Sequence, residues 1–229
     1  MQLTREVQVA IDGPAGAGKS SVAREVAEAL GYVYIDTGAM YRAVAYRALQ
    51  AGLDAEADAQ AVGRLAGRLS FEFRAIGGEQ RLFVDKQDVS KPIRTPQVGN
   101  LSSPVSAIPQ VRKHLLSAQR SMASSGGTVM EGRDIGTVVL PDAQVKVFLT
   151  ASPTERARRR QEQLRRKGIE QSLDTILGDI RERDHRDSTR AVAPLKKADD
   201  ALELITDGMD KAQVVARLIQ IVHEAEESA

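Results

Sequence analysis

Residues 13 to 20 read Gly13-Pro14-Ala15-Gly16-Ala17-Gly18-Lys19-Ser20. The spacing G-x-x-x-x-G-K-[ST] is that of a P-loop, in which successive backbone N–H groups face an anion. An apolar run at residues 7–11 precedes the loop, and an amphipathic stretch at residues 21–30 follows it. A strand, a glycine-rich turn and the start of a helix are what a P-loop requires. The stretch therefore predicts a nucleoside triphosphate site.

Each residue of this loop has an expected part in holding a triphosphate. The glycines let the backbone curl around the phosphates, and the helix N-terminus adds partial positive charge. Lys19, which we expect to be exposed in the empty loop, can reach the terminal phosphates, and the Ser20 hydroxyl can bind Mg²⁺. The predicted ATP-binding residues are Gly13, Pro14, Ala15, Gly16, Ala17, Gly18, Lys19, Ser20 and Ser21.

Composition narrows the classes of protein. The chain has 229 residues, 42% of them hydrophobic, which is enough for a well-buried core. Its 32 Lys and Arg residues nearly balance 31 Asp and Glu residues, so charge gives no global argument for a nucleic acid or membrane partner. The absence of cysteine excludes disulfides and thiolate metal sites. Because residues 1–6 lack a signal-peptide apolar region, we expect a cytoplasmic protein, and a monomer that binds neither nucleic acid nor membrane.

Short apolar runs alternate with helical patterns along the chain. The runs fall at residues 7–11, 32–35, 128–130, 145–149 and 202–205. Helical spacing marks residues 39–51 and 55–69. Strands that alternate with helices indicate a parallel sheet with helices on both faces. The sequence therefore predicts an α/β protein with the three-layer P-loop fold and a central, mostly parallel sheet of about five strands.

One stretch breaks this alternation. Phe71 and Phe73 alternate with charged residues, Gly77-Gly78 makes a turn, and residues 82–84 are apolar again, which is the pattern of a β-hairpin. We expect the hairpin to lie in an inserted subdomain, residues 65–100, of a single domain that spans residues 1–229. Prolines at four positions from 92 to 109 predict short helices and turns over residues 91–108. A longer helix is predicted at residues 110–124.

A polar cluster follows the second predicted strand. Its sequence is Asp36-Thr37-Gly38-Ala39-Met40-Tyr41-Arg42. In open parallel sheets, ligands bind beyond the carboxyl ends of the strands. Asp36 or Thr37 can either cap the next helix or contact a ligand, and the sequence favours neither interpretation over the other. Arg42, about one helical turn further on, can point back toward the strand ends, the alternative being a solvated helix face.

A second cluster follows the third predicted strand. It reads Glu131-Gly132-Arg133-Asp134-Ile135-Gly136-Thr137. Its glycines permit close backbone approach, Arg133 can bind a phosphate with two hydrogen bonds, and Asp134 can accept from a base amine or lie near a metal. The alternative is a loop with a surface ion pair. The other partners of Mg²⁺ stay open, with Asp12 and Asp36 as candidates beyond Ser20.

Two later stretches, residues 155–168 and 181–190, are rich in arginine. Solvated helices with pairs such as Arg183–Asp187 would explain them, and so would nucleic-acid binding, which the interspersed acids disfavour. A third interpretation is a mobile cationic lid at residues 155–170. A phosphoryl-transfer enzyme needs such a lid to neutralise the transferring group and to exclude water.

Together these segments resemble the bacterial cytidylate kinases, a family of nucleoside monophosphate kinases. The matching segments are Asp12 with the P-loop, the two polar clusters, Arg183-Asp184-His185-Arg186-Asp187, and Arg190-Ala191-Val192-Ala193-Pro194-Leu195. They occur in the family's order, and the family's monophosphate-binding insert matches the hairpin. The P-loop is common to many families, whereas the Gly-Arg-Asp-x-Gly-Thr and Arg-Asp-x-x-Arg segments are much more specific. Glu131 and Thr150 stand where many relatives have Asp.

The resemblance implies a role for each matching residue. The acceptor phosphate would be held by Arg42, Arg133 and Arg190. The cytosine edge would be read by Ser103, Arg112 and Asp134. Arg183 and Asp187 would contact the sugar hydroxyls, with Thr37 beside the acceptor. The expected catalytic residues are Lys19, Arg133, Arg158, Arg159 and Arg190.

The resemblance also implies a reaction. ATP, with Mg²⁺, would phosphorylate CMP or dCMP to CDP or dCDP by direct in-line transfer. One alternative is a kinase for another small acceptor, such as UMP or shikimate. The other is a P-loop nucleotide switch or ATPase.

Overall fold

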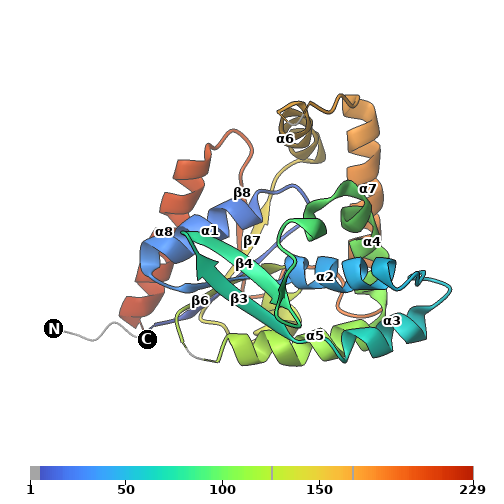
Figure 1. The fold of residues 1–229 in the computed structure, drawn as a ribbon. Helices are drawn as coiled ribbons and strands as arrows, with labels where there is room; N and C mark the ends of the chain where they lie inside the picture. Colours follow the sequence, from blue (N-terminus) through green and yellow to red (C-terminus); the bar gives the residue numbers. More distant parts are fainter. Residues whose placement is uncertain (1–5, 125, 167, 229) are drawn as a thin grey trace. The chain divides into compact units, whose positions relative to one another are not determined.

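A computed structural model describes residues 6–124, 126–166 and 168–228 (Figure 1). Lys167, a cation of the predicted lid, and the N-terminal residues 1–5 lie outside the described residues. The chain divides into two compact units, the first formed by Met1–Tyr34 with Ser125–Ala229 and the second by Ile35–Ser124. No helix within the described ranges is long and apolar enough to cross a membrane.

A five-stranded parallel sheet with the order β2-β6-β1-β7-β8 belongs to the first unit except for the last two residues of β2. Its strands are β1 (Gln8–Asp12), β2 (Val33–Asp36), β6 (Thr128–Gly132), β7 (Val145–Thr150) and β8 (Leu202–Ile205). β1 pairs in parallel with β6 and β7, so Val9 lies opposite both Val129 and Val145. The predicted α/β class and the five predicted strands are confirmed. Because β1 is central, the loop that follows it begins in the middle of the sheet's carboxyl edge.

Helices cover this sheet and extend from it. They are α1 (Lys19–Leu30), α6 (Pro153–Arg165), α7 (Leu173–Thr189) and α8 (Lys211–Ser228), with a π-helical turn at Ile135–Val139. α1 and α8 pack side by side (Figure 1), and Val22, Val26 and Leu218 join the strand side chains in one core. α6 and α7 share a smaller cluster made of Ala157, Leu164, Ile176 and Ile180.

The second unit contains a helical group and a small sheet. Its helices are α2 (Thr37–Gln50), α3 (Ala59–Ala66), the 3₁₀ turn η1 (Pro92–Arg94), α4 (Pro96–Ala107) and α5 (Pro109–Met122). Its antiparallel strands are β3 (Phe71–Ile76), β4 (Glu79–Val84) and β5 (Gln87–Asp88). Phe73 lies opposite Leu82, which confirms the predicted hairpin. The predicted insert, residues 65–100, falls within this unit, which has its own core around Met40, Val111 and Leu115.

The expectation of short helices and turns over residues 91–108 is wrong for most of that stretch. α4 is a single helix of 12 residues with Pro104 inside it. Thr95 caps the helix by accepting a hydrogen bond from the N–H of Val98, and Pro96 occupies the first turn, where its missing N–H is not needed. Burial of Val98 and Val105 offsets the hydrogen bond that Pro104 removes.

Candidate active site

The P-loop leaves β1 at Asp12 and ends at the first residue of α1. Gly13 has φ 149° and Gly16 has φ 77°, and a Cβ at Gly13 would lie 1.9 Å from the carbonyl oxygen of Leu149. Only glycine fits at position 13, because a side chain would collide with the backbone of β7. Gly18 precedes α1 and has no side chain with which to cap it. The first amides of α1 are thus suited to binding an anion.

Lys19 is buried, contrary to the expectation of an exposed side chain. Only 5% of its surface is accessible, and its Nζ donates to the carbonyl oxygens of Gly13 and Pro14, both at 2.8 Å. Burial and the charge of Arg133 together lower the pKa of the Lys19 ammonium to about 7. The lysine thus folds back onto its own loop, where two carbonyl oxygens accept from its ammonium group.

The two serines of the motif differ. Ser20 is exposed on the first turn of α1, while the Ser21 hydroxyl donates to the carbonyl of Gly18 at 2.9 Å. The described residues hold no group of three or more His, Cys, Asp or Glu side chains that could bind a metal. The chemistry of this site fits Mg²⁺, which commonly binds one or two protein oxygens together with substrate phosphates and water.

Asp12 ties the base of the P-loop to the turn after β6. Its carboxylate accepts hydrogen bonds from the N–H groups of Ile135 (2.8 Å) and Gly136 (2.7 Å). Burial raises the pKa of Asp12 to about 6. At the end of β6, the Tyr34 hydroxyl donates to the Glu131 carboxylate at 2.5 Å. The Gly132-Arg133-Asp134 segment therefore starts from a fixed backbone.

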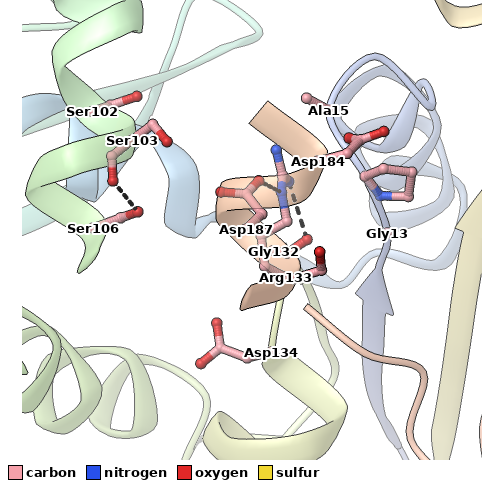
Figure 2. Close-up of polar contacts among 12 residues, drawn as sticks. Gly13, Ala15, Ser102, Ser103, Ser106, Gly132, Arg133, Asp134, Asp184 and Asp187 are labelled. Atoms are coloured by element: carbon pink, nitrogen blue, oxygen red, sulfur yellow. Dashed lines mark hydrogen bonds and ion pairs between the residues drawn. The ribbon is translucent and has the colours of Figure 1, made fainter. Parts of the chain in front are cut away.

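Two ion pairs join this segment to α7 and the residue after it. Arg133 Nε lies 2.9 Å from Asp187 Oδ2, drawn as a dashed line in Figure 2, and Arg190 Nη2 lies 3.2 Å from Asp134 Oδ1. Burial opposes the charged form of Asp187, but Arg133 and Arg183 outweigh it and hold the pKa of that carboxyl below its usual range. The structure thus brings together five predicted site residues: Arg133, Asp134, Arg183, Asp187 and Arg190.

The arginines of α6 have three different environments. Arg158 is exposed, and Arg159 donates to Glu155 Oε1 at 3.0 Å and to the carbonyl of Thr206 at 2.7 Å. Arg156, which sequence reasoning missed, is the α6 arginine that contacts the P-loop, through the carbonyl of Ala15 at 2.9 Å. Four arginines within five positions give no periodic signal that could have singled it out. The expected entry of Arg158 and Arg159 into the site stays a prediction.

The second unit holds the first polar cluster at the start of α2. Asp36 caps this helix by accepting from the Ala39 N–H at 2.8 Å, which confirms its predicted capping role. Its other oxygen lies 2.8 Å from Arg42 Nη2, so Arg42 points back toward the start of its helix. Thr37, the first residue of α2, is buried.

Ser103 and Arg112 lie on α4 and α5 of the same unit. The hydroxyls of Ser102 and Ser106 donate to carbonyls three residues earlier, whereas the buried Ser103 hydroxyl has no hydrogen-bond partner within the described chain (Figure 2). Arg112 is buried, donates to the Ser106 carbonyl at 3.2 Å, and stacks 5.4 Å from the ring centre of Tyr41. A buried hydroxyl without a partner is expected where a ligand supplies one.

Comparisons with known proteins agree with this geometry. A family model described as cytidylate kinase matches residues 9–224. A cytidylate kinase of Streptococcus gordonii is 51% identical over 213 residues, 93% of this chain and 94% of the relative. One of Mycolicibacterium paratuberculosis is 50% identical over 230 residues, 99% of this chain and 100% of the relative.

A crystal structure of an uncharacterized protein from Eubacterium ventriosum aligns with a TM-score of 0.50 at 13% identity, covering 95% of this chain and 99% of that one. That likeness shows the fold alone. The family model and the full-length relatives show more, since they extend from the P-loop through α7: the chain belongs to the cytidylate kinase family.

Proposed function

We propose that this chain transfers the terminal phosphate of ATP to CMP or dCMP, giving ADP and CDP or dCDP. The observation that carries the proposal is the attachment of the Gly-Arg-Asp turn to the P-loop. Asp12 binds two amides of the turn, and the turn's Arg133 and Asp134 pair with Asp187 and Arg190. Groups suited to an acceptor thus lie next to groups suited to ATP, as the family relationship leads one to expect.

The chemistry asks for positioning and charge neutralisation rather than for a strong base. The acceptor is already a phosphate oxyanion, so its nucleophile needs no deprotonation. The Lys19 ammonium and the P-loop amides hold the ATP phosphates, and Lys19 leaves the Gly13 and Pro14 carbonyls to do so. Ser20 would hold Mg²⁺, which would supply positive charge to neutralise phosphate oxygens. Arg158 and Arg159 are proposed to approach the transferring group from α6.

The acceptor nucleotide is proposed to bind the residues that the family relationship implies. Its phosphate binds Arg42, Arg133 and Arg190, and its sugar binds Arg183 and Asp187, with Thr37 close by. The partnerless Ser103 hydroxyl, together with Arg112 and Asp134, reads the base. We further propose that the protein is a cytoplasmic monomer whose partners are these nucleotides rather than nucleic acid or membrane; light scattering tests the monomer.

Base choice follows from hydrogen-bond polarity. Cytosine presents an amine donor beside a ring-nitrogen acceptor, which matches a carboxylate at Asp134 and a guanidinium at Arg112. Uracil presents a carbonyl beside an N–H, so both protein groups would be left unpaired. Each buried unpaired polar group costs about 1–3 kcal/mol, so CMP should be used much better than UMP.

ADP release, measured with CMP, dCMP, UMP, shikimate or no acceptor, tests the function. We expect strong stimulation by CMP and dCMP only. Asp134→Asn should narrow the CMP preference, because an amide can donate to the uracil carbonyl. Equal use of CMP and UMP by the parent protein would remove the cytidylate assignment, and slow hydrolysis indifferent to every acceptor would favour a switch or ATPase. An unchanged CMP/UMP ratio in the variant would remove Asp134 from base reading.

A further inference from the structure

Arg156 is enclosed by three separate parts of the first unit. It lies on the first turn of α6 with 3% of its surface exposed. Its Nε donates to the carbonyl of Ala151, the residue directly after β7, at 2.9 Å, and its Nη1 donates to the Ala15 carbonyl of the P-loop at 2.9 Å. Asp184 of α7 accepts from Nη1 at 3.1 Å and from Nη2 at 2.6 Å.

In these contacts the guanidinium of Arg156 donates its hydrogen bonds to acceptors of the protein itself. A buried guanidinium requires a counter-charge, and the two-bond pair with Asp184 supplies it in the geometry that arginine favours. Four donated hydrogen bonds hold the plane of the guanidinium in one orientation. Lysine could not reproduce this set, because its ammonium is a point donor on a flexible stem. Arg156 therefore differs from a lid arginine that is free to move onto a phosphate.

The contact with Ala15 orients an amide of the loop. The peptide bond between Ala15 and Gly16 is planar and trans, so the Gly16 N–H points opposite to the Ala15 carbonyl. Arg156 holds that carbonyl on one side of the loop, which aims the Gly16 N–H to the other side. Gly16 also lies against the arginine stem, since a Cβ there would be 3.4 Å from Arg156 Cβ. Gly16 has φ 77°, and because glycine is conformationally permissive, this peptide plane depends on outside contacts to hold it.

We propose that Arg156 and Asp184 are positioning residues for the phosphates of the donor nucleotide. Asp184 fixes the guanidinium, and the guanidinium fixes the Ala15–Gly16 peptide so that the Gly16 N–H meets a phosphate oxygen. The link acts on the donor and leaves the acceptor contacts in place. The inference rests on the proposed function only in taking ATP as the donor.

Conservative variants test the link, because Arg156→Ala leaves a cavity and an unpaired carboxylate that would destabilise the fold. Asp184→Asn keeps the shape of the side chain and removes its negative charge. Arg156→Lys keeps the positive charge and removes the planar set of guanidinium donors. The matched control is Glu162→Gln, which removes a carboxylate from an exposed α6 pair, Glu162–Arg166 at 3.1 Å. Ion pairs on the protein surface contribute little to the stability of the fold.

Calorimetric binding of ATP and of CMP, each alone, gives the decisive measurement. We expect Asp184→Asn and Arg156→Lys each to weaken ATP binding by about tenfold or more, as loss of an aligned hydrogen bond to a charged group implies. The Kd for CMP should stay within about twofold of the parent value in both variants, and Glu162→Gln should bind ATP as the parent protein does. The double variant should bind ATP no more weakly than the weaker-binding single variant, because the two residues act through one link.

Two results would overturn the proposal. One is ATP binding by Asp184→Asn as tight as that of the Glu162→Gln control. The other is an equal weakening of ATP and CMP together with a lowered Tm, which marks a merely structural pair. Because these are binding measurements, they decide the role of the link even if the parent protein failed to phosphorylate CMP, a result that would count against the proposed function alone.

Discussion

Asp12 keeps a carboxylate where water hardly reaches it. Burial raises its pKa to about 6, although the hydrogen bonds from Ile135 and Gly136 favour the charged form. Between about pH 4 and pH 6 the folded protein therefore holds a proton that the unfolded chain has already lost. The contribution of Asp12 to stability is fully present below pH 4 and is lost as the pH rises through 6.

Asp12→Asn, which does not titrate, exposes this effect. From pH 4 to pH 7 the parent protein should lose on the order of 2–3 kcal/mol of unfolding free energy relative to the variant. Urea unfolding at several pH values measures the difference. Asp54 is the control, because its exposed carboxylate also accepts two backbone N–H bonds but has a lowered pKa. Its titration lies below about pH 4, so the stability of Asp54→Asn should run parallel to that of the parent protein from pH 4 to pH 7. Parallel curves for Asp12→Asn and the parent protein would contradict the prediction.

Individual residues also mark the limit of sequence reasoning. The P-loop and the Gly-Arg-Asp turn were predictable, because their glycines and charges are fixed by spacing. The enclosure of Arg156 was not, since neighbouring Arg158 and Arg159 have the same chemistry and only the packing of α6 against α7 separates them. The burial of Lys19 was missed because its partners are carbonyl groups, which every residue possesses.

At the scale of elements, α6 and α7 form a helical pair with a small core of its own. Ala157, Leu164, Ile176 and Ile180 are the buried members of that core. The predicted lid, residues 155–170, takes in most of α6 and the connection after it. Of the long helix α7, the sequence indicated only the arginine-rich part at residues 181–190, with a solvated helix as one interpretation. Likewise, proline spacing suggested breaks where α4 continues through Pro104. In α4, burial of apolar side chains outweighed the local pattern.

The lid interpretation predicts a difference in hydrogen exchange. Exposed arginines on α6 repel one another in the free protein, and two bound nucleotides should draw the segment closed by shifting its population. Amides across residues 155–170 should therefore exchange more slowly with a bisubstrate analogue bound, while those of α8 stay unchanged. Equal protection with and without the analogue would identify a static, solvated helix instead.

At the scale of the whole molecule, each of the two units has a large apolar core. Leu115 of α5 is fully buried in the core of the second unit, and Leu218 of α8 is fully buried in the core of the first. The sequence indicated a hairpin insert but not the extent of the second unit. That extent depends on packing among α2, α4 and α5, which join residues far apart in the chain.

Matched truncations test whether these cores are independent. Leu115→Ala and Leu218→Ala should each lower the unfolding free energy by about 2–5 kcal/mol, because each removes buried methyl groups and leaves a cavity. The loss of unfolding free energy in the double variant should equal the sum of the two single losses within about 0.5 kcal/mol, as is usual for sites without shared partners. Denaturant titrations of the three variants give the comparison. A coupling energy well above that limit would mean that the two clusters act as one core.

The cations predicted to hold phosphate are already engaged within the protein. Arg133 pairs with Asp187, Arg190 with Asp134, and Arg42 with Asp36. When a nucleotide binds at such a site, its phosphate replaces a carboxylate as the partner of each arginine. The gain in binding free energy is therefore the difference between the arginine–phosphate and arginine–carboxylate interactions, rather than the full attraction of an unpaired arginine. The affinity for the nucleotide should then depend less on ionic strength than the number of arginines suggests. Release of the product is also easier, because the carboxylates can pair with the arginines again as the product leaves.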